Sequence, residues 1–400
     1  MGDNMHAWIE QTIRNEYEKA ENEPDYRYFL KAKFDFLNAS EKKYYASVLQ
    51  LVESGVGSAY PCAAVAVGQG HTVFARTFFG QRQVLPTALD LTEDTLFDLA
   101  SLSKLVSTTM VALKMIENGK LNLHDKIGKY LDFAGNFADC EIYHLLTHTS
   151  GLPAGLPLFA MVHKDGDALH TVLSAEPCYE TGTQVCYSCM GYLVLQRILE
   201  NVGGDPLDKL AEKYVFSPLG MKTACYNPDK AKMPIAATEL YTHNGAWATG
   251  HVHDENAHFL GGVTGNAGVF ATLDDLISFA GMCATHGLAK NGDVYLSKEM
   301  FDLAITNFTP DKNESRGLGF QLKGQQDFPG GILLSQGSYG HTGFTGTSLY
   351  VDKDTGLWGI LLTNAVHYGR ENRTKYFALR RGFYDSLMRE YKILQCESEI

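Results

Sequence analysis

Ser101 and Lys104 lie three residues apart at the start of a strongly apolar helical pattern. Residues with this spacing share one face of an α-helix, one turn from each other. A serine hydroxyl is a weak nucleophile at neutral pH and needs a base, and an amine held in a desolvated pocket can be that base. The positive end of the helix dipole also favours negative charge that develops near Ser101. The pair therefore predicts acyl transfer through a serine nucleophile.

This spacing is not specific by itself, because Ser40 and Lys43 repeat it in a charged segment. Two later segments strengthen the prediction of acyl transfer. Tyr187 comes just before a helical pattern, where a phenol can face a pocket and shuttle protons when a neighbouring ammonium lowers its pKa. A core tyrosine with a satisfied hydroxyl fits the same residue. Residues 339–346 (Tyr-Gly-His-Thr-Gly-Phe-Thr-Gly) precede a clear strand pattern, and their glycines allow close approach to a ligand or a tight strand entry.

Strand patterns at both ends of the chain and helical patterns between them must position these residues. Residues 62–67 and 72–79 are β-rich and are joined by a glycine-containing turn, which predicts a hairpin. The helix that begins at Ser101 ends at Asn118 and Gly119, a pair typical of C-caps. The pattern predicts one discontinuous sheet domain with an α-helical insertion. Further strands are expected at 319–322, 348–351 and 357–362, and further helices at 45–52, 192–201, 273–285 and 372–391.

The domain boundaries follow from the same patterns. Residues 45–100 and 301–392 are expected to form one discontinuous sheet domain with flanking helices, and residues 101–300 the mainly helical insertion. Residues 1–44 are predicted to be an N-terminal helical extension that caps the site, mediates dimerisation or packs on the sheet, and residues 393–400 a C-terminal tail.

Composition narrows the class of partner. The chain has 34 Lys plus Arg against 46 Asp plus Glu, a net charge of -12, which argues against a nucleic-acid or anionic-membrane surface. The sequence shows no secretory signal and no apolar run of membrane-spanning length, so we expect a cytoplasmic protein whose eight cysteines are reduced thiols. A small-molecule substrate is the expected partner, without nucleic acid, membrane or cofactor, and the oligomeric state is left open.

Two other clusters could indicate different chemistry. Cys186 and Cys189, with Cys178 nearby, have the spacing of a metal or redox pair, but no second pair accompanies them. His251 and His253 alternate as metal-ligating histidines on a strand do, but the residues after them do not complete such a ligand set. We expect a loop-packing role for these histidines, or one beside the catalytic residues, and no metal.

Taken in chain order, the three motifs resemble those of the serine β-lactamase and penicillin-binding-protein-like hydrolases, particularly the class C β-lactamase and esterase branch. That family has SxxK, then a Tyr-x-Asn loop, then Lys-Thr-Gly or His-Thr-Gly on a sheet strand. The resemblance extends from about residue 45 to 387 and implies a β-lactamase/transpeptidase-like α+β fold. In this fold an antiparallel sheet flanked by helices carries an inserted all-helical domain, and the nucleophile lies in the cleft between the two domains. Other segments that resemble the family are 97–101, 145–152, 218–221, 252–257 and 361–364.

The resemblance also implies a role for each site residue. Ser101 would be the acylated nucleophile and Lys104 its partner in proton transfer. Tyr187 would be the general base in acylation, would protonate the leaving group and would activate water for deacylation. His341 would polarise the site and form a hydrogen bond toward the tyrosine or the substrate. The backbone N–H groups of Ser101 and Phe344 would form the oxyanion hole, in which losing one donor typically costs about 100- to 1000-fold in turnover.

The substrate-binding residues implied by the family are Cys189, Thr342 and Gly343. Cys189 stands where the family has asparagine, and a thiol is a weak donor and a weak acceptor. Amide recognition therefore suffers more than ester hydrolysis, and we expect a serine hydrolase that acts on a small ester through an acyl-enzyme. The alternatives are a true β-lactamase or D-amino-acid peptidase, and a non-catalytic ligand-binding or sensor protein on the same fold.

Overall fold

A computed structural model describes residues 45–398, apart from 164–165, 242–245, 325–326 and 372. The helical extension predicted for residues 1–44 lies outside these described residues.

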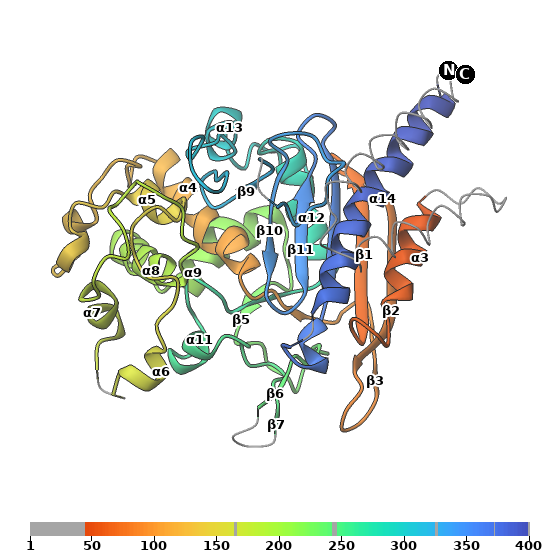
Figure 1. The fold of residues 1–400 in the computed structure, drawn as a ribbon, viewed down its shortest axis with the longest axis horizontal. Helices are drawn as coiled ribbons and strands as arrows, with labels where there is room; N and C mark the ends of the chain where they lie inside the picture. The colour runs from red at the N-terminus through yellow and green to blue at the C-terminus, as the bar shows by residue number, and fades with distance from the viewer. Residues whose placement is uncertain (1–44, 164–165, 242–245, 325–326, 372, 399–400) are drawn as a thin grey trace.

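A seven-stranded antiparallel sheet joins the two ends of the chain (Figure 1). Strand β1 (Cys62–Gln69) pairs with β2 (Thr72–Gln83) on one side and with β12 (Leu357–Thr363) on the other. The predicted hairpin is therefore confirmed, and so is the α+β fold with strands from both ends in one sheet. Completing the order β3-β2-β1-β12-β11-β10-β9 are β3 (Leu89–Asp90), β11 (Thr347–Val351), β10 (Tyr339–Gly343) and β9 (Gln321–Leu322).

Side chains of β1 alternate between two hydrophobic cores, as the period of a strand requires. Val65 belongs to the core beneath the helices α3 (Ala46–Ser54) and α14 (Thr374–Ser398), which lie along the same flank of the sheet in Figure 1. Ala64 and Ala66 belong to the larger core, which continues into the helical region. The sheet is thus covered on both faces.

Helix α14 is longer than the sequence predicted. We expected it to end at Tyr391 and a tail to begin at residue 393, but the helix runs to Ser398. Leu394 lies almost one turn beyond Tyr391, and both pack against the core beneath α14. The apolar stripe therefore continues into the segment predicted as a tail.

The segment between residues 101 and 300 is mainly helical, and it also contains short strands. The helix α12 (Leu273–Ala284) at its end packs on the sheet, against β1, β11 and β12. A small second sheet has the order β4-β8-β5, and its strands are two or three residues long, too short for a sequence pattern to reveal. Its strands are β4 (Phe97–Asp98), β8 (Val269–Ala271) and β5 (Cys225–Tyr226), and β6 (Leu240–Tyr241) pairs with β7 (Ala246–Trp247).

The first long helical segment begins just after Ser101. That segment is π-helical over η1 (Lys104–Thr109) and α-helical over α4 (Met110–Glu117), and Gly119 follows it with a positive φ of 67°, as predicted for its C-cap. The other helices are α5 (Ile142–Leu146), α6 (Leu158–Met161), α7 (Ala168–Leu173), α8 (Cys189–Gly203), α9 (Leu207–Ala211), α10 (Ser217–Leu219), α11 (Glu255–Phe259) and α13 (Lys298–Ala304), with single turns at η2 (Ile127–Lys129), η3 (Gly135–Phe137), η4 (Glu212–Phe216) and η5 (Ala365–Tyr368).

All eight cysteines lie within the described residues, and each is a free thiol. In the part of the chain that the structure describes, no helix combines the length and the apolar character needed to cross a lipid bilayer.

Candidate active site

Ser101 lies at a sharp turn between a short strand and a helix. Strand β4 ends at Asp98, and Ala100 then takes a positive φ of 46°, a conformation that side chains with a Cβ rarely adopt. The Asp98 carboxylate holds this turn, because it accepts hydrogen bonds from the N–H of Ala100 (2.8 Å) and of His253 (2.6 Å). Helical structure begins at Leu102, so the turn places Ser101 at the N-terminal end of the helix.

Lys104 is completely buried beside Ser101, and its ammonium group has three acceptors. Nζ donates to Ser101 Oγ (3.1 Å), to the backbone carbonyl of Asn266 (2.9 Å) and to Cys189 Sγ (3.5 Å). Burial alone would favour the neutral amine, but Cys189 and Tyr187 outweigh it and raise the pKa of Lys104 above its ordinary value. The lysine is therefore a cation at neutral pH, and all three of its N–H groups are used.

Tyr187 packs against this cation. Its ring centroid lies 4.9 Å from Lys104 Nζ, and its hydroxyl is buried without a hydrogen-bond partner among the described residues. Burial raises the pKa of the Tyr187 phenol, and the charge of Lys104 opposes that rise. The resting form is thus a neutral phenol beside an ammonium, and its oxygen is available to the Ser101 hydroxyl, to water or to a substrate.

The loop that carries Tyr187 is fixed by residues far away in the chain. The Asn313 side chain makes two hydrogen bonds of 2.9 Å to the backbone N–H and carbonyl of Val185. His148 adds two more, because its Nδ1 accepts from the Ser188 N–H (3.0 Å) and its carbonyl from the Cys186 N–H (2.9 Å). Ser188 is also the N-cap of α8, so the loop is held at both ends of the tyrosine.

His341 faces the same tyrosine from strand β10, with ring centroids 5.8 Å apart. Its Nδ1 bonds the backbone carbonyl of Thr342 at 2.7 Å, and because a carbonyl can only accept, this nitrogen carries the proton. Burial first, and then the cations Arg316 and Lys104, lower the pKa of His341 to about 3. The imidazole is therefore neutral over the physiological range, and its Nε2 is an acceptor.

The end of β10 packs directly on the turn that carries Ser101. A Cβ on Gly343 would lie 2.2 Å from the carbonyl oxygen of Leu99, so only glycine allows this approach. Thr345 Oγ1 donates to the carbonyl of Asp98 at 2.7 Å. These contacts bring the backbone that follows His341-Thr342-Gly343 beside the predicted nucleophile.

Two backbone N–H groups at this contact are free to bind an oxyanion. Neither Ser101 nor Phe344 uses its N–H in a hydrogen bond within the described residues. The Phe344 side chain points elsewhere: it is 47% exposed and stacks on the His253 ring at 5.6 Å. Oxyanion binding at position 344 therefore depends on the backbone N–H and not on the aromatic ring.

The competing clusters have other partners. His253 binds Glu239 Oε2 through its ring (2.7 Å), and the rings of His251 and His258 lie 5.6 Å apart. Over the described residues, no group of three or more His, Cys, Asp or Glu side chains could hold a metal ion. Cys189, one residue of the CxxC spacing, contacts Lys104.

Arg316 and Asn313 have no counterpart in the sequence predictions, and His148 lies in the family-like segment 145–152 but had no predicted role. Arg316 is 4% exposed, and its Cζ lies 5.5 Å from the Tyr187 ring centroid. A charged residue within the otherwise apolar, glycine-containing stretch 316–320 (Arg-Gly-Leu-Gly-Phe) is the signal that could have indicated it. The other two became visible only through hydrogen bonds between distant segments.

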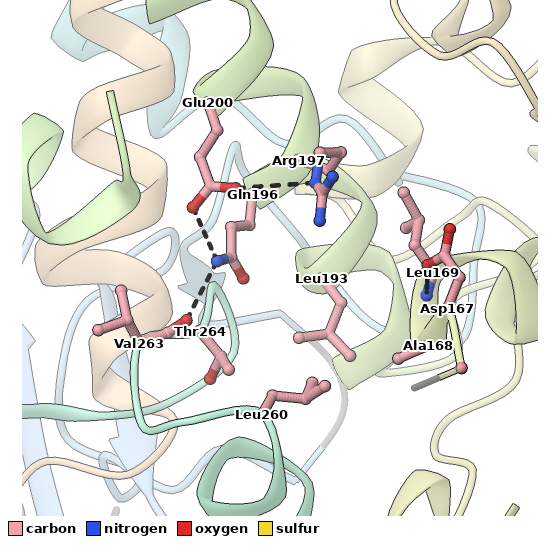
Figure 2. A pocket seen from close by; sticks show the side chains of 11 residues that line it. Asp167, Ala168, Leu169, Leu193, Gln196, Arg197, Glu200, Leu260, Val263 and Thr264 are labelled. Atoms are coloured by element: carbon pink, nitrogen blue, oxygen red, sulfur yellow. Dashed lines mark hydrogen bonds and ion pairs between the residues drawn. The ribbon is translucent and has the colours of Figure 1, made fainter. Parts of the chain in front are cut away.

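A separate pocket of about 260 Å³ runs along α8 and contains no predicted site residue (Figure 2). Figure 2 shows the Gln196 side chain between Glu200 and Val263. The Gln196 amide donates to the Val263 carbonyl (3.1 Å) and accepts from the Gly265 N–H (2.9 Å). It thereby ties α8 to the loop whose next residue, Asn266, accepts a hydrogen bond from Lys104.

Comparisons of the sequence with known proteins extend over most of the chain. The family model described as Beta-lactamase matches residues 48–382. An Escherichia coli (strain K12) protein named "Putative D-alanyl-D-alanine carboxypeptidase" is 33% identical in an alignment 314 positions long, which covers 69% of this chain and 70% of that protein. A Bacillus subtilis (strain 168) protein named "N-acetylmuramyl-L-alanine amidase" is 28% identical in an alignment 356 positions long, which covers 80% of each chain.

Solved structures share the fold at lower identity. The hydrolase EstCE1, described as having promiscuous acyltransferase activity, superposes with a TM-score of 0.67 at 20% identity, over 84% of this chain and 97% of that chain. A penicillin-binding protein homologue from Caulobacter crescentus gives a TM-score of 0.68 at 18% identity, over 87% of this chain and 99% of that chain. At these identities the likeness concerns the fold, which is the one that the three motifs implied.

Proposed function

The chain belongs to the beta-lactamase family, and from this premise we propose that it is a serine hydrolase that cleaves a small ester through an acyl-enzyme on Ser101. The observation that carries the proposal is the contact between Lys104 Nζ and Ser101 Oγ (3.1 Å), beside a buried Tyr187 hydroxyl that has no other partner in the described chain. This arrangement supports roles for Ser101 as nucleophile, Tyr187 as proton-handling group and nearby backbone N–H groups as oxyanion donors.

Tyr187, once it has lost its proton, is the base in this proposal. Lys104 is unsuited to that role, because it is a cation whose three N–H groups each have an acceptor. A phenolate beside the ammonium forms an ion pair, and the Lys104 charge favours this form of the tyrosine. Lys104 therefore stabilises the base and orients Ser101.

Acylation begins with attack by Ser101 on the ester. The Ser101 hydroxyl proton passes to the Tyr187 oxygen while Oγ forms a bond to the ester carbonyl carbon, and the carbonyl electron pair moves to oxygen. The N–H groups of Ser101 and Phe344 bind that oxyanion. When the intermediate collapses, the bond to the leaving alcohol breaks, and its oxygen takes the proton from Tyr187. Water repeats the sequence on the acyl-enzyme, and His341 Nε2 is an acceptor that can orient this water.

Cys189 supports an ester in preference to an amide as the substrate. Its thiol contacts Lys104 and offers a substrate amide only weak hydrogen bonding. The names of the two relatives favour a second candidate, a D-amino-acid peptidase or another amide hydrolase, and a true β-lactamase belongs to the same class of alternatives. A non-catalytic ligand-binding or sensor protein is the third. The cytoplasmic location and the small-molecule partner remain predictions from the sequence.

Hydrolysis of a panel of p-nitrophenyl esters, amides and a chromogenic cephalosporin, with Ser101→Ala as the control, tests this proposal. We expect ester turnover in the wild type and a loss of about 1000-fold or more in Ser101→Ala. Full ester turnover by Ser101→Ala would show that the mechanism is wrong. Faster turnover of the cephalosporin or the amides would favour the second candidate, and stable acylation without turnover would favour the third.

A further inference from the structure

A second buried cation lies against the Tyr187 ring, on a segment that the proposed mechanism does not use. The Arg316 Cζ is 5.5 Å from the ring centroid, and Lys104 Nζ is 4.9 Å from it. Arg316 is only 4% exposed, so its charge acts through protein and is weakly screened by solvent. Two cations therefore act on one phenol.

The backbone of Arg316 is fixed, so the guanidinium has a defined position. Its N–H donates to Thr309 Oγ1 (2.8 Å), and its carbonyl accepts from the Phe308 N–H (2.8 Å). On its outer side, Nε donates to Glu314 Oε2 at 2.9 Å. The Glu314 side chain is 32% exposed, so water screens the electrostatic effect of its carboxylate more than that of the buried guanidinium. The guanidinium is the charge of this segment that lies against the Tyr187 ring.

The other side of the tyrosine offers no comparable charge. His341 stands at the position where many members of the family have lysine, but its imidazole is neutral, because burial, Arg316 and Lys104 lower its pKa to about 3. His148 is neutral for the same kind of reason, since burial first and Arg316 next hold its pKa well below the ordinary value. The titratable or charged groups around Tyr187 are Lys104 on η1, Cys189 and Tyr192 on α8, His148 after α5, His341 on β10, and Arg316 with Glu314 before β9.

We infer that Arg316 is a positioning residue of the active site, which holds the Tyr187 ring in place and supplies the second positive charge that favours its phenolate as the base. The inference rests on the proposed function, since it concerns the base in acylation of Ser101. Arg316 touches Tyr187 and not the reacting atoms, so it acts through the tyrosine. Both contacts of the 307–316 segment then serve to position Tyr187, because Asn313 fixes its loop and Arg316 fixes its ring.

The direction of the pH dependence follows from the charges. The base must lose a proton, and burial raises the pKa of Tyr187, so kcat/KM for an ester rises with pH along an alkaline limb. Removing a cation disfavours the phenolate and moves the midpoint of that limb to higher pH. Removing the carboxylate that partly neutralises the cation moves it to lower pH. A merely structural role would lower activity or stability without moving the midpoint.

The test measures kcat/KM for a p-nitrophenyl ester across the neutral and alkaline range, with Ser101→Ala as the background. We expect Arg316→Met to raise the midpoint by about one pH unit and Arg316→Lys to keep it within about 0.3 units of the wild type. Glu314→Gln should lower it by about half a unit. Arg380→Met removes another buried arginine, on α14, and should leave the midpoint in place.

A fluorophosphonate label read by mass spectrometry separates the possible failures. Suppose that Ser101 is labelled in the wild type and in all Arg316 and Glu314 variants. If Arg316→Met and Glu314→Gln nevertheless keep the wild-type midpoint, the inference about Arg316 is wrong and the proposed function stands. If Ser101 is not labelled in the wild type, both are wrong. If Arg316→Met does not fold, Glu314→Gln decides alone: a lower midpoint supports the inference, and an unchanged or higher one contradicts it.

Discussion

The ammonium group of Lys104 and the hydroxyl group of Tyr187 are both buried in one site, but they differ in their hydrogen bonding. Each N–H of Lys104 has an acceptor, whereas the Tyr187 hydroxyl has no partner among the described residues. A buried polar group without a partner costs about 1–3 kcal/mol, so a fold tolerates it where the group has another use. The comparison indicates that Lys104 is a fixed part of the framework, and that the hydrogen-bonding capacity of Tyr187 is kept for the reaction.

The two residues also differ in how the chain holds them. Lys104 shares one helical turn with Ser101 and reaches Asn266 and Cys189 from there. Tyr187 depends on a loop that Asn313 ties down from 128 residues away, and on Arg316 beside its ring. Local sequence thus provides the nucleophile and its cation, and long-range packing provides the base.

Replacing Tyr187 with phenylalanine gives the largest effect that separates the two residues. We expect ester kcat/KM to fall by about 100- to 10,000-fold, because the proton-handling oxygen is lost. The free energy of unfolding should stay the same or rise by about 1 kcal/mol, since an unpaired buried hydroxyl is removed. Ester kinetics and chemical denaturation of the same samples measure both quantities.

Lys104→Met is the matched control. It should lose activity and stability together, because it leaves the Asn266 carbonyl without its donor. Wild-type activity within tenfold in Tyr187→Phe, or a clear loss of its stability, would contradict the division of roles between the two residues.

Asn313→Ala tests whether the Tyr187 loop needs its distant anchor. The variant loses both hydrogen bonds to Val185, so we expect kcat to fall by about tenfold, KM to change less, and the unfolding free energy to drop by about 1–2 kcal/mol. Asn201→Ala removes a side-chain hydrogen bond to the Tyr130 carbonyl (3.1 Å) away from the Tyr187 loop, so it is the control and should keep its kcat. Equal losses in both variants would mean that the segment acts only through general stability.

Cys189→Asn should have the smallest effect and concerns the substrate. An amide at this position both donates and accepts, so we expect the ratio of amide to ester turnover to rise by about three- to tenfold, with ester turnover little changed. Cys189→Ala removes the thiol without adding an amide and should leave the ratio in place. If both variants change the ratio equally, the thiol and not the missing amide determines the preference for esters.

Much of the framework could be predicted from the sequence, because it depends on local patterns. The hairpin of β1 and β2, the return of strands near the C-terminus and the helix after Ser101 all follow from period and turn chemistry. The short strands such as β8 and the continuation of α14 to Ser398 could not be predicted in this way. Strands of two or three residues have no recognisable period, and the helix end depends on the packing of Leu394.

In the site, the motifs indicated which residues meet, and the environment determines their charge. Ser101, Lys104, Tyr187 and His341 do lie together, as the resemblance implied. That His341 is a neutral acceptor follows from its burial and from the Arg316 and Lys104 charges, none of which a single motif reveals. Arg316 and Asn313 belong to segments far from the motifs, and only the folded chain brings them to Tyr187.

Intact-protein mass spectrometry after reaction with a fluorophosphonate, followed by peptide mapping, tests whether Ser101 is the nucleophile. We expect one adduct per chain, located on Ser101 and absent in Ser101→Ala, with much slower formation in Tyr187→Phe. An adduct on another residue, equal labelling of Ser101→Ala, or no adduct in the wild type would contradict this role.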